Sequence, residues 1–128
     1  MSATDLVMYR GDTRSFQLTM AEDGAPLDLT GATLRFTGKR KIGDDDADAV
    51  VSVATGSGIV VTYAVNGEIR VTIPSDQTEA LTKETVLLWD VQIVFLDGSV
   101  RTIPEPVVGD ESTLGTLTIK LDVTRTAP

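Results

Sequence analysis

The chain has 128 residues and a formal net charge of −8, from 11 basic and 19 acidic residues, with neither histidine nor cysteine. A domain of this length buries roughly two-thirds of its unfolded surface and folds without disulfides, while the missing residue types remove the usual general base, metal ligand and thiolate. The acidic balance argues against nucleic acid as a partner, because phosphate binding requires clustered Lys and Arg.

The first ten residues predict an N-terminal arm or a first edge strand. They lack the basic segment and apolar core of a signal peptide, and no apolar run in the chain reaches the ~20 residues of a membrane span. We therefore expect a soluble protein made in the cytosol. Arg10-Gly11-Asp12 spells a cell-adhesion tripeptide, but a bend before a strand at residues 15–20 explains it more simply.

Three dipeptides predict tight turns between strands: Asp23-Gly24, Asn66-Gly67 and Asp97-Gly98. Such turns need a positive φ, which Gly, Asn and Asp tolerate. The second dipeptide joins alternating strands at residues 59–63 and 68–73, which is the clearest hairpin in the sequence. The chain therefore predicts an antiparallel β protein.

Between the first two turns, a bend at Thr30-Gly31 leads to a strand at residues 33–37. Leu34 and Phe36 alternate with polar neighbours, so we expect both side chains to face the core. A polar loop then precedes a short strand at residues 50–53.

That polar loop places a basic cluster, residues 39–41, close to several acids. Three of the acids alternate as at the start of a calcium loop: Asp44, Asp46 and Asp48. The match then fails, because Ala49 and Thr55 stand where such a loop needs its glycine and its bidentate acid. We expect a solvated loop of opposite charges, with neither a phosphate site nor a metal site.

One short helical segment is expected after Pro74. Ser75 or Asp76 is placed to cap it, because their side chains accept the free amides of a first turn. The segment extends through Leu81, and Ala80 and Leu81 are expected to face the core.

The longest strand is predicted at residues 86–95, where the apolar density suggests burial on both faces. It turns back to a strand at residues 99–103, and residues 117–124 alternate as a half-buried final strand. The tally of about eight strands with short turns is typical of a β-sandwich. We expect a single domain over residues 1–128, with an arm at 1–9 and a tail at 124–128.

No catalytic group emerges from the remaining polar residues. Hydrolysis by paired carboxylates needs two acids across a cleft, and nothing in the sequence pairs Asp90 with Glu68 or Asp122. The hydroxyl side chains have no histidine to activate them, and no phosphate-binding Gly loop is present. We expect Asp90 to have a backbone or arginine partner, because a buried carboxylate requires one. The sequence thus predicts no enzyme and no cofactor.

Carbohydrate or cell-surface binding is the alternative function. Such a site usually presents exposed aromatic side chains, and the strand patterns assign Trp89, Phe36 and Phe95 to the core. Tyr9 and Tyr63 are then the candidate platforms.

Several phrases along the chain match, in order, those of a known protein family. They are Arg10-Gly11-Asp12-Thr13, Asp28-Leu29-Thr30-Gly31-Ala32-Thr33, Leu88-Trp89-Asp90-Val91-Gln92 and Ile119-Lys120-Leu121-Asp122-Val123-Thr124-Arg125. The pattern resembles the immunoglobulin-like N-terminal domain of the baseplate upper proteins of tailed bacteriophages. This resemblance spans nearly the whole chain and implies that the β-sandwich is immunoglobulin-like.

The resemblance also implies a non-enzymatic structural protein of the virion, made in the bacterial host, that docks to neighbours in the tail or baseplate or on the capsid surface. Several copies are expected, as a homo-oligomer or in a symmetric assembly. The chain ends at Pro128 without the long region that carries receptor-binding proteins in that family, so we expect a docking module. The contacts are expected from the arm, the acidic loop and the tail: Leu6, Val7, Met8, Tyr9, Asp44, Asp45, Asp46, Thr124 and Arg125.

Overall fold

A computed structural model of the chain describes residues 5–22, 24–41, 43–103 and 115–122. Within these ranges the strands are β1 (Asp5–Tyr9), β2 (Arg14–Thr19), β3 (Ala21–Glu22), β4 (Ala25–Pro26), β5 (Thr33–Lys39), β6 (Val51–Thr55), β7 (Gly58–Tyr63), β8 (Glu68–Ile73), β9 (Thr85–Val94), β10 (Val100–Ile103) and β11 (Gly115–Lys120). Three short 3-10 turns accompany them: η1 (Asp46–Asp48), η2 (Ala64–Asn66) and η3 (Ser75–Gln77). The prediction of an all-β chain is confirmed, but the prediction that its strands are antiparallel is wrong at two places, where β1 pairs with β11 and β6 with β7 in parallel. None of the helical turns in the described part is long and apolar enough to cross a membrane.

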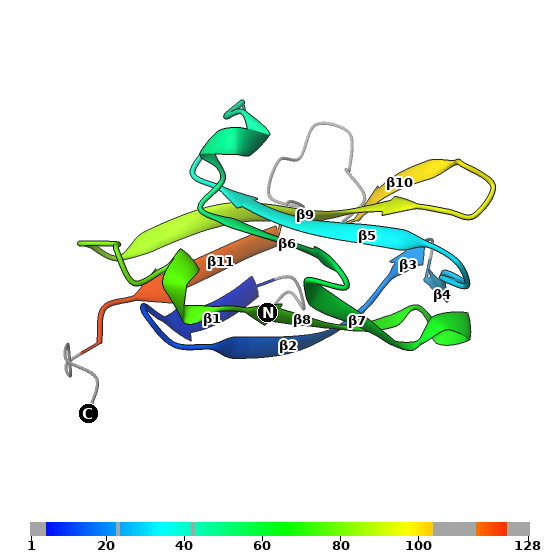
Figure 1. Cartoon of the computed structure of the whole chain (residues 1–128), viewed down its shortest axis with the longest axis horizontal. Coiled ribbons are helices and arrows are strands. Elements are labelled where there is room, and N and C mark those ends of the chain that lie inside the picture. The colour runs from blue at the N-terminus through cyan, green and yellow to red at the C-terminus, as the bar shows by residue number, and fades with distance from the viewer. Residues whose placement is uncertain (1–4, 23, 42, 104–114, 123–128) are drawn as a thin grey trace.

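The larger strands form one continuous sheet that curls round the core (Figure 1). Its order is β1-β11-β9-β5-β6-β7-β8-β2, and β10 pairs with β9 beyond the end of β11. The sheet curls until its two end strands, β1 and β2, come near each other, so it is barrel-like and nearly closed (Figure 1). A sandwich of two separate sheets is not confirmed, because Ala54 and Thr55 of β6 pair with Gly58 and Ile59 of β7 and join the two halves.

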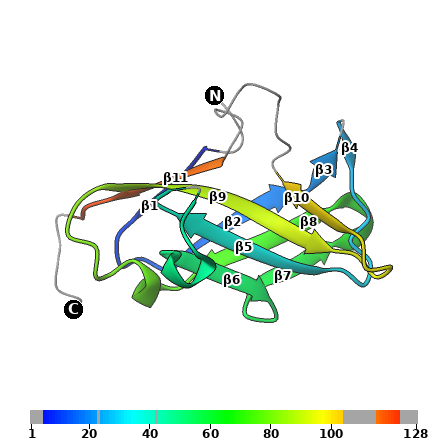
Figure 2. The ribbon, with the colours of Figure 1, turned by 90° about the horizontal axis from the view of Figure 1, so that it is seen from above.

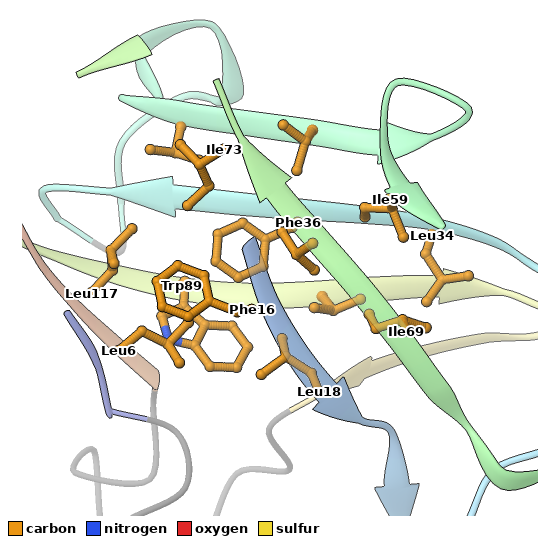
Figure 3. Packing of buried hydrophobic residues seen from close by; sticks show 14 of the residues in the cluster. Leu6, Phe16, Leu18, Leu34, Phe36, Ile59, Ile69, Ile73, Trp89 and Leu117 are labelled. Carbon is orange, nitrogen blue, oxygen red and sulfur yellow. The ribbon is translucent and has the colours of Figure 1, made fainter. Parts of the chain in front are cut away.

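The core lies between two walls of this curled sheet. Figures 1 and 2 together show β5 and β9 on one side of the core and β2 and β8 on the other. Phe36 of β5 and Trp89 of β9 stack with ring centroids 5.1 Å apart, and Phe16 and Leu18 of β2 belong to the same core cluster (Figure 3). Leu34 and Phe36 are buried as predicted.

The three predicted glycine turns are present, and each glycine has a positive φ: 79° at Gly24, 69° at Gly67 and 91° at Gly98. They connect β3 to β4, β7 to β8 and β9 to β10. At Gly67 a side chain is excluded twice, by the positive φ and by the backbone of Leu27, whose carbonyl oxygen would lie 2.9 Å from a Cβ.

Strand β9 corrects one prediction about burial. It is central in the sheet, but its side chains alternate strictly between buried and more exposed positions. Val86 is 53 % exposed and Gln92 is exposed as well, so burial on both faces was wrong. Hydrogen-bonded neighbours on both edges of a strand do not cover its outer face, which here faces solvent.

The predicted helix and the predicted last strand are both shorter than expected. Only η3 forms after Pro74, without a side-chain cap, and Ala80 is exposed while Leu81 is buried. The Gln77 side chain instead hydrogen-bonds the backbone N–H and C=O of Ser52, both at 3.0 Å. Strand β11 ends at Lys120, and Leu121 after it is 43 % exposed.

Candidate docking surfaces

Strand β1 stands at one end of the sheet and combines a buried face with an exposed one. Leu6 and Met8 are buried in the core, whereas Val7 is 50 % and Tyr9 53 % exposed. The strand pairs in parallel with β11, which places Val7 beside Thr118 and Tyr9 beside Lys120. Of the four arm residues expected to bind partners, only Val7 and Tyr9 therefore present side chains outward, because Leu6 and Met8 on the other face belong to the hydrophobic core.

The other edge of β1 has no strand beside it in the described part of the chain. The Arg10 N–H donates to the Lys120 carbonyl at 2.9 Å, which continues the β1–β11 ladder. Backbone groups along a strand alternate in direction, so those of residues 6 and 8 also point to β11. The N–H and C=O groups of Asp5 and Val7 and the N–H of Tyr9 point away from β11, while the Tyr9 carbonyl accepts the Asp12 N–H at 3.2 Å.

Arg10 anchors the end of β1 and cannot serve as part of an adhesion motif. Its side chain is 4 % exposed, and its Nε donates to Asp122 Oδ1 at 3.0 Å while Nη1 donates to the Leu81 carbonyl at 2.7 Å. Nη2 lies 2.9 Å from the same Asp122 oxygen and forms an ion pair with it, but the geometry at Nη2 does not meet that of a hydrogen bond. Gly11 donates its N–H to Thr78 Oγ1 at 2.8 Å. A buried guanidinium is unavailable to a receptor, so the tripeptide is structural.

The acidic loop is folded back on a lysine of β5. Lys39 Nζ lies 2.7 Å from Asp46 Oδ1 and donates to the Asp44 carbonyl at 2.8 Å. The hydrogen bond that the Lys39 ammonium donates to Asp46 lowers the pKa of Asp46 and raises the pKa of Lys39. Asp45 is exposed. Within the described ranges, no three carboxylates, histidines or cysteines gather as a metal site.

A hollow of about 170 Å³ lies on the outer face of β5 and β9. Arg35, Lys39 and Asp46 line it together with Asp90 and Thr102. Sequence reasoning missed this assembly, because Asp46 and Asp90 come together only when β5 pairs with β9. The pairing places Thr37 opposite Asp90. Lys39 follows Thr37 by two positions and so lies on the same face of β5, diagonally across from Asp90. The sequence shows this spacing within β5 but not the register that brings Lys39 to Asp90.

Asp90 has a lysine as its charged neighbour, rather than the expected arginine or backbone group. Burial raises its pKa, and the positive charge of Lys39 opposes that shift. Lys39 therefore interacts with both carboxylates of the hollow, and its ammonium is bonded to Asp46. Arg35 also lines the hollow, so two cations and two carboxylates form a charge-balanced cluster on the surface of the sheet.

The aromatic residues proposed as carbohydrate platforms lie on separate strands. Tyr9 ends β1 and Tyr63 ends β7, and their exposed fractions are 53 % and 54 %. These two strands are not neighbours in the sheet, and they lie apart in Figure 1. They therefore do not form one stacking surface.

The hairpin between β9 and β10 exposes an apolar group that the sequence analysis did not select. Leu96 is 80 % exposed, and Val94 and Val100 face each other across the hairpin with 37 % and 48 % exposed. The turn itself is held by the Asp97 carboxylate, which accepts the Ser99 N–H at 2.9 Å. The predicted tail residues Thr124 and Arg125 lie outside the described residues.

Comparison with known proteins places this β protein in a family. No curated protein matches the chain. The model of the BppU N-terminal domain family, the N-terminal domain of the phage baseplate upper protein, matches residues 3–82, more than half of the chain. The match takes in β1, its Arg10 anchor and every strand up to β8, while β9, β10 and β11 complete the same sheet. The chain thus belongs to the family of the N-terminal domain of the baseplate upper protein, a structural family of the phage baseplate.

Proposed function

We propose that this chain is a non-enzymatic structural component of the phage baseplate, present in several copies, that docks to neighbouring virion proteins through β1. The observation that carries the proposal is the edge of β1 that has no strand beside it among the described residues, and β1 belongs to the segment that matches the baseplate family. An edge strand with unpaired backbone groups is a template for another chain. In a multi-copy particle even a small contact is effective, because repeated contacts reinforce one another.

Two finer statements belong to this proposal. We infer that residues 1–128 form one domain, because β9 and β11 pair with β5 and β1 of the matched segment. We also infer an immunoglobulin-like arrangement, with the walls described above as its two layers and β6–β7 as the link between them. The acidic loop is a weaker docking candidate than β1, because Asp44 and Asp46 are already engaged by Lys39.

The test is the composition of purified virions. Mass spectrometry of separated tails and heads should find the chain in tails, in a fixed ratio to other tail proteins. Particles assembled with Val7→Glu should contain less of the chain than particles with Val60→Glu, which alters an equally exposed valine of β7. A chain found only outside particles, or only on heads, would contradict the proposal.

A further inference from the structure

We propose that the free edge of β1 pairs with the same edge of a second copy of this chain, in antiparallel orientation, about a two-fold axis at Val7. This inference rests on the docking role proposed above and names the partner for that same edge. Four features carry it: the direction of the free backbone groups, the alternation of the side chains, the exposed valines and the placement of charges.

The free backbone groups of β1 are self-complementary. They belong to Asp5, Val7 and Tyr9, which are evenly spaced around Val7. In an antiparallel pair, residues whose groups point toward the partner exchange both of their hydrogen bonds. A two-fold axis at Val7 sets Val7 opposite Val7 of the second copy, and Asp5 opposite Tyr9. The free groups of Val7 and the Tyr9 N–H then meet groups of the opposite kind. The Asp5 N–H meets the Tyr9 carbonyl, which also accepts the Asp12 N–H and has a second lone pair to accept with.

The same register keeps the two faces of the sheet in agreement. Leu6 comes opposite Met8 of the second copy, and both are core residues, while Val7 and Tyr9 stay on the outer face. A slip of one residue would turn the core side chains outward, so this register is strongly preferred. The pairing therefore extends the sheet of one copy into that of the other.

The outer face offers an apolar contact at the axis. Val7 pairs with Thr118 in register, and Thr118 pairs with Val86, so two half-exposed valines lie in one row across β1, β11 and β9. The two-fold axis joins this row to its copy, with both Val7 side chains at the centre. Cross-strand β-branched side chains in such rows stabilise a sheet.

The charges at this edge favour the antiparallel arrangement over the parallel one. Parallel pairing would set Asp5 beside Asp5 of the second copy, and like charges directly opposite destabilise a sheet. Antiparallel pairing sets Asp5 opposite Tyr9, whose neighbour on β11 is Lys120. Lys120 of one copy then lies about 10 Å from Asp5 of the other, two strand spacings away. This local balance opposes the repulsion of two chains of charge −8.

A single introduced cysteine tests the axis directly, because the chain has no other cysteine. Opposed residues of a hydrogen-bonded antiparallel pair have Cα atoms about 5.5 Å apart, within the range of a disulfide. Val7→Cys should therefore cross-link two copies under mild oxidation of the isolated chain. The matched control is Val86→Cys, with 53 % exposure against 50 % and a place on the same face away from the edge.

We expect Val7→Cys to form the disulfide dimer at least about tenfold faster than Val86→Cys, because pairing raises the effective concentration of the two sulfurs. Native mass spectrometry of Val7→Lys should show loss of the dimer, and Val86→Lys should keep it. Equal cross-linking rates, or a dimer unaffected by Val7→Lys, would overturn the pairing. If the pairing fails while virions still contain the chain, the docking role stands and the neighbour is a different protein.

Discussion

Gly115 of β11 lies against the side chain of Trp89, the only tryptophan in the sequence, and its replacement by alanine should destabilise the protein. Gly115 is opposite Trp89 in register, and a Cβ there would lie 2.6 Å from the indole Nε1 and closer still to Cε2. The indole is not free to move aside. It is 3 % exposed, stacks on Phe36, and donates from Nε1 to the Thr116 carbonyl at 3.1 Å.

The expected loss follows from two opposing effects. Forcing an extra methyl group into a packed core costs about 1–3 kcal/mol. Replacing Gly by Ala also reduces the entropy of the unfolded chain, which returns about 0.4–1 kcal/mol. Because the indole cannot move aside, we expect a cost near the upper end of the first range, so the net loss in the free energy of unfolding is about 2 kcal/mol. Such a loss lowers the Tm of a domain of this size by roughly 5–10 °C.

Urea denaturation followed by tryptophan fluorescence measures this loss, since Trp89 is the only tryptophan. The matched control is Gly43→Ala, which makes the same chemical change where no atom lies within 4 Å of the added Cβ. The control should be neutral or slightly stabilising. A Gly115→Ala protein as stable as the parent would refute the packing assigned to β11 and, with it, the support that β11 gives to β1.

Three further predictions address the core, the anchor and the hollow. Phe36→Ala should cost about 3–5 kcal/mol in urea unfolding, because it removes a fully buried ring; a cost under about 1 kcal/mol would contradict its burial. Arg10→Ala should lower the free energy of unfolding several times more than Arg70→Ala, which removes an exposed arginine. Equal losses would show that Arg10 does not anchor the end of β1. Asp90→Asn should raise the Tm at neutral pH, because burial raises the pKa of Asp90 from 3.8 and so penalises its charged form in the folded state. That gain should shrink as the pH falls through the raised pKa toward 3.8, where the parent is protonated; a gain independent of pH would refute the assignment.

Local signals in the sequence were sufficient for the turns and for much of the core. Asn66-Gly67 favours a turn because Gly adopts a positive φ readily, so the β7–β8 hairpin is predictable from a local signal, although η2 precedes Gly67 in the turn. The alternation at Leu34 and Phe36 likewise marks the buried face of β5 without knowledge of its neighbours.

Features that depend on distant pairings were not predictable in this way. Leu6 and Met8 are core residues because parallel pairing with β11, more than a hundred residues away, sets their face of β1 against the core. Asp90 finds Lys39 only through the register of β9 on β5. The sequence contains these residues but no local signal of the strand that each one pairs with. All four arm residues were therefore expected to be available for docking, although Leu6 and Met8 are buried.

The most direct test of the docking account is photocross-linking in the intact virion at position 9. A photoreactive phenylalanine analogue at Tyr9 of β1 should cross-link to a virion protein, either a second copy of the chain or another baseplate component. The same analogue at Tyr63 of β7 is the matched control, because the two tyrosines are equally exposed. The account predicts a strong cross-link from position 9 and little from position 63. Cross-linking from position 63 alone, or equally from both positions, would contradict docking through β1.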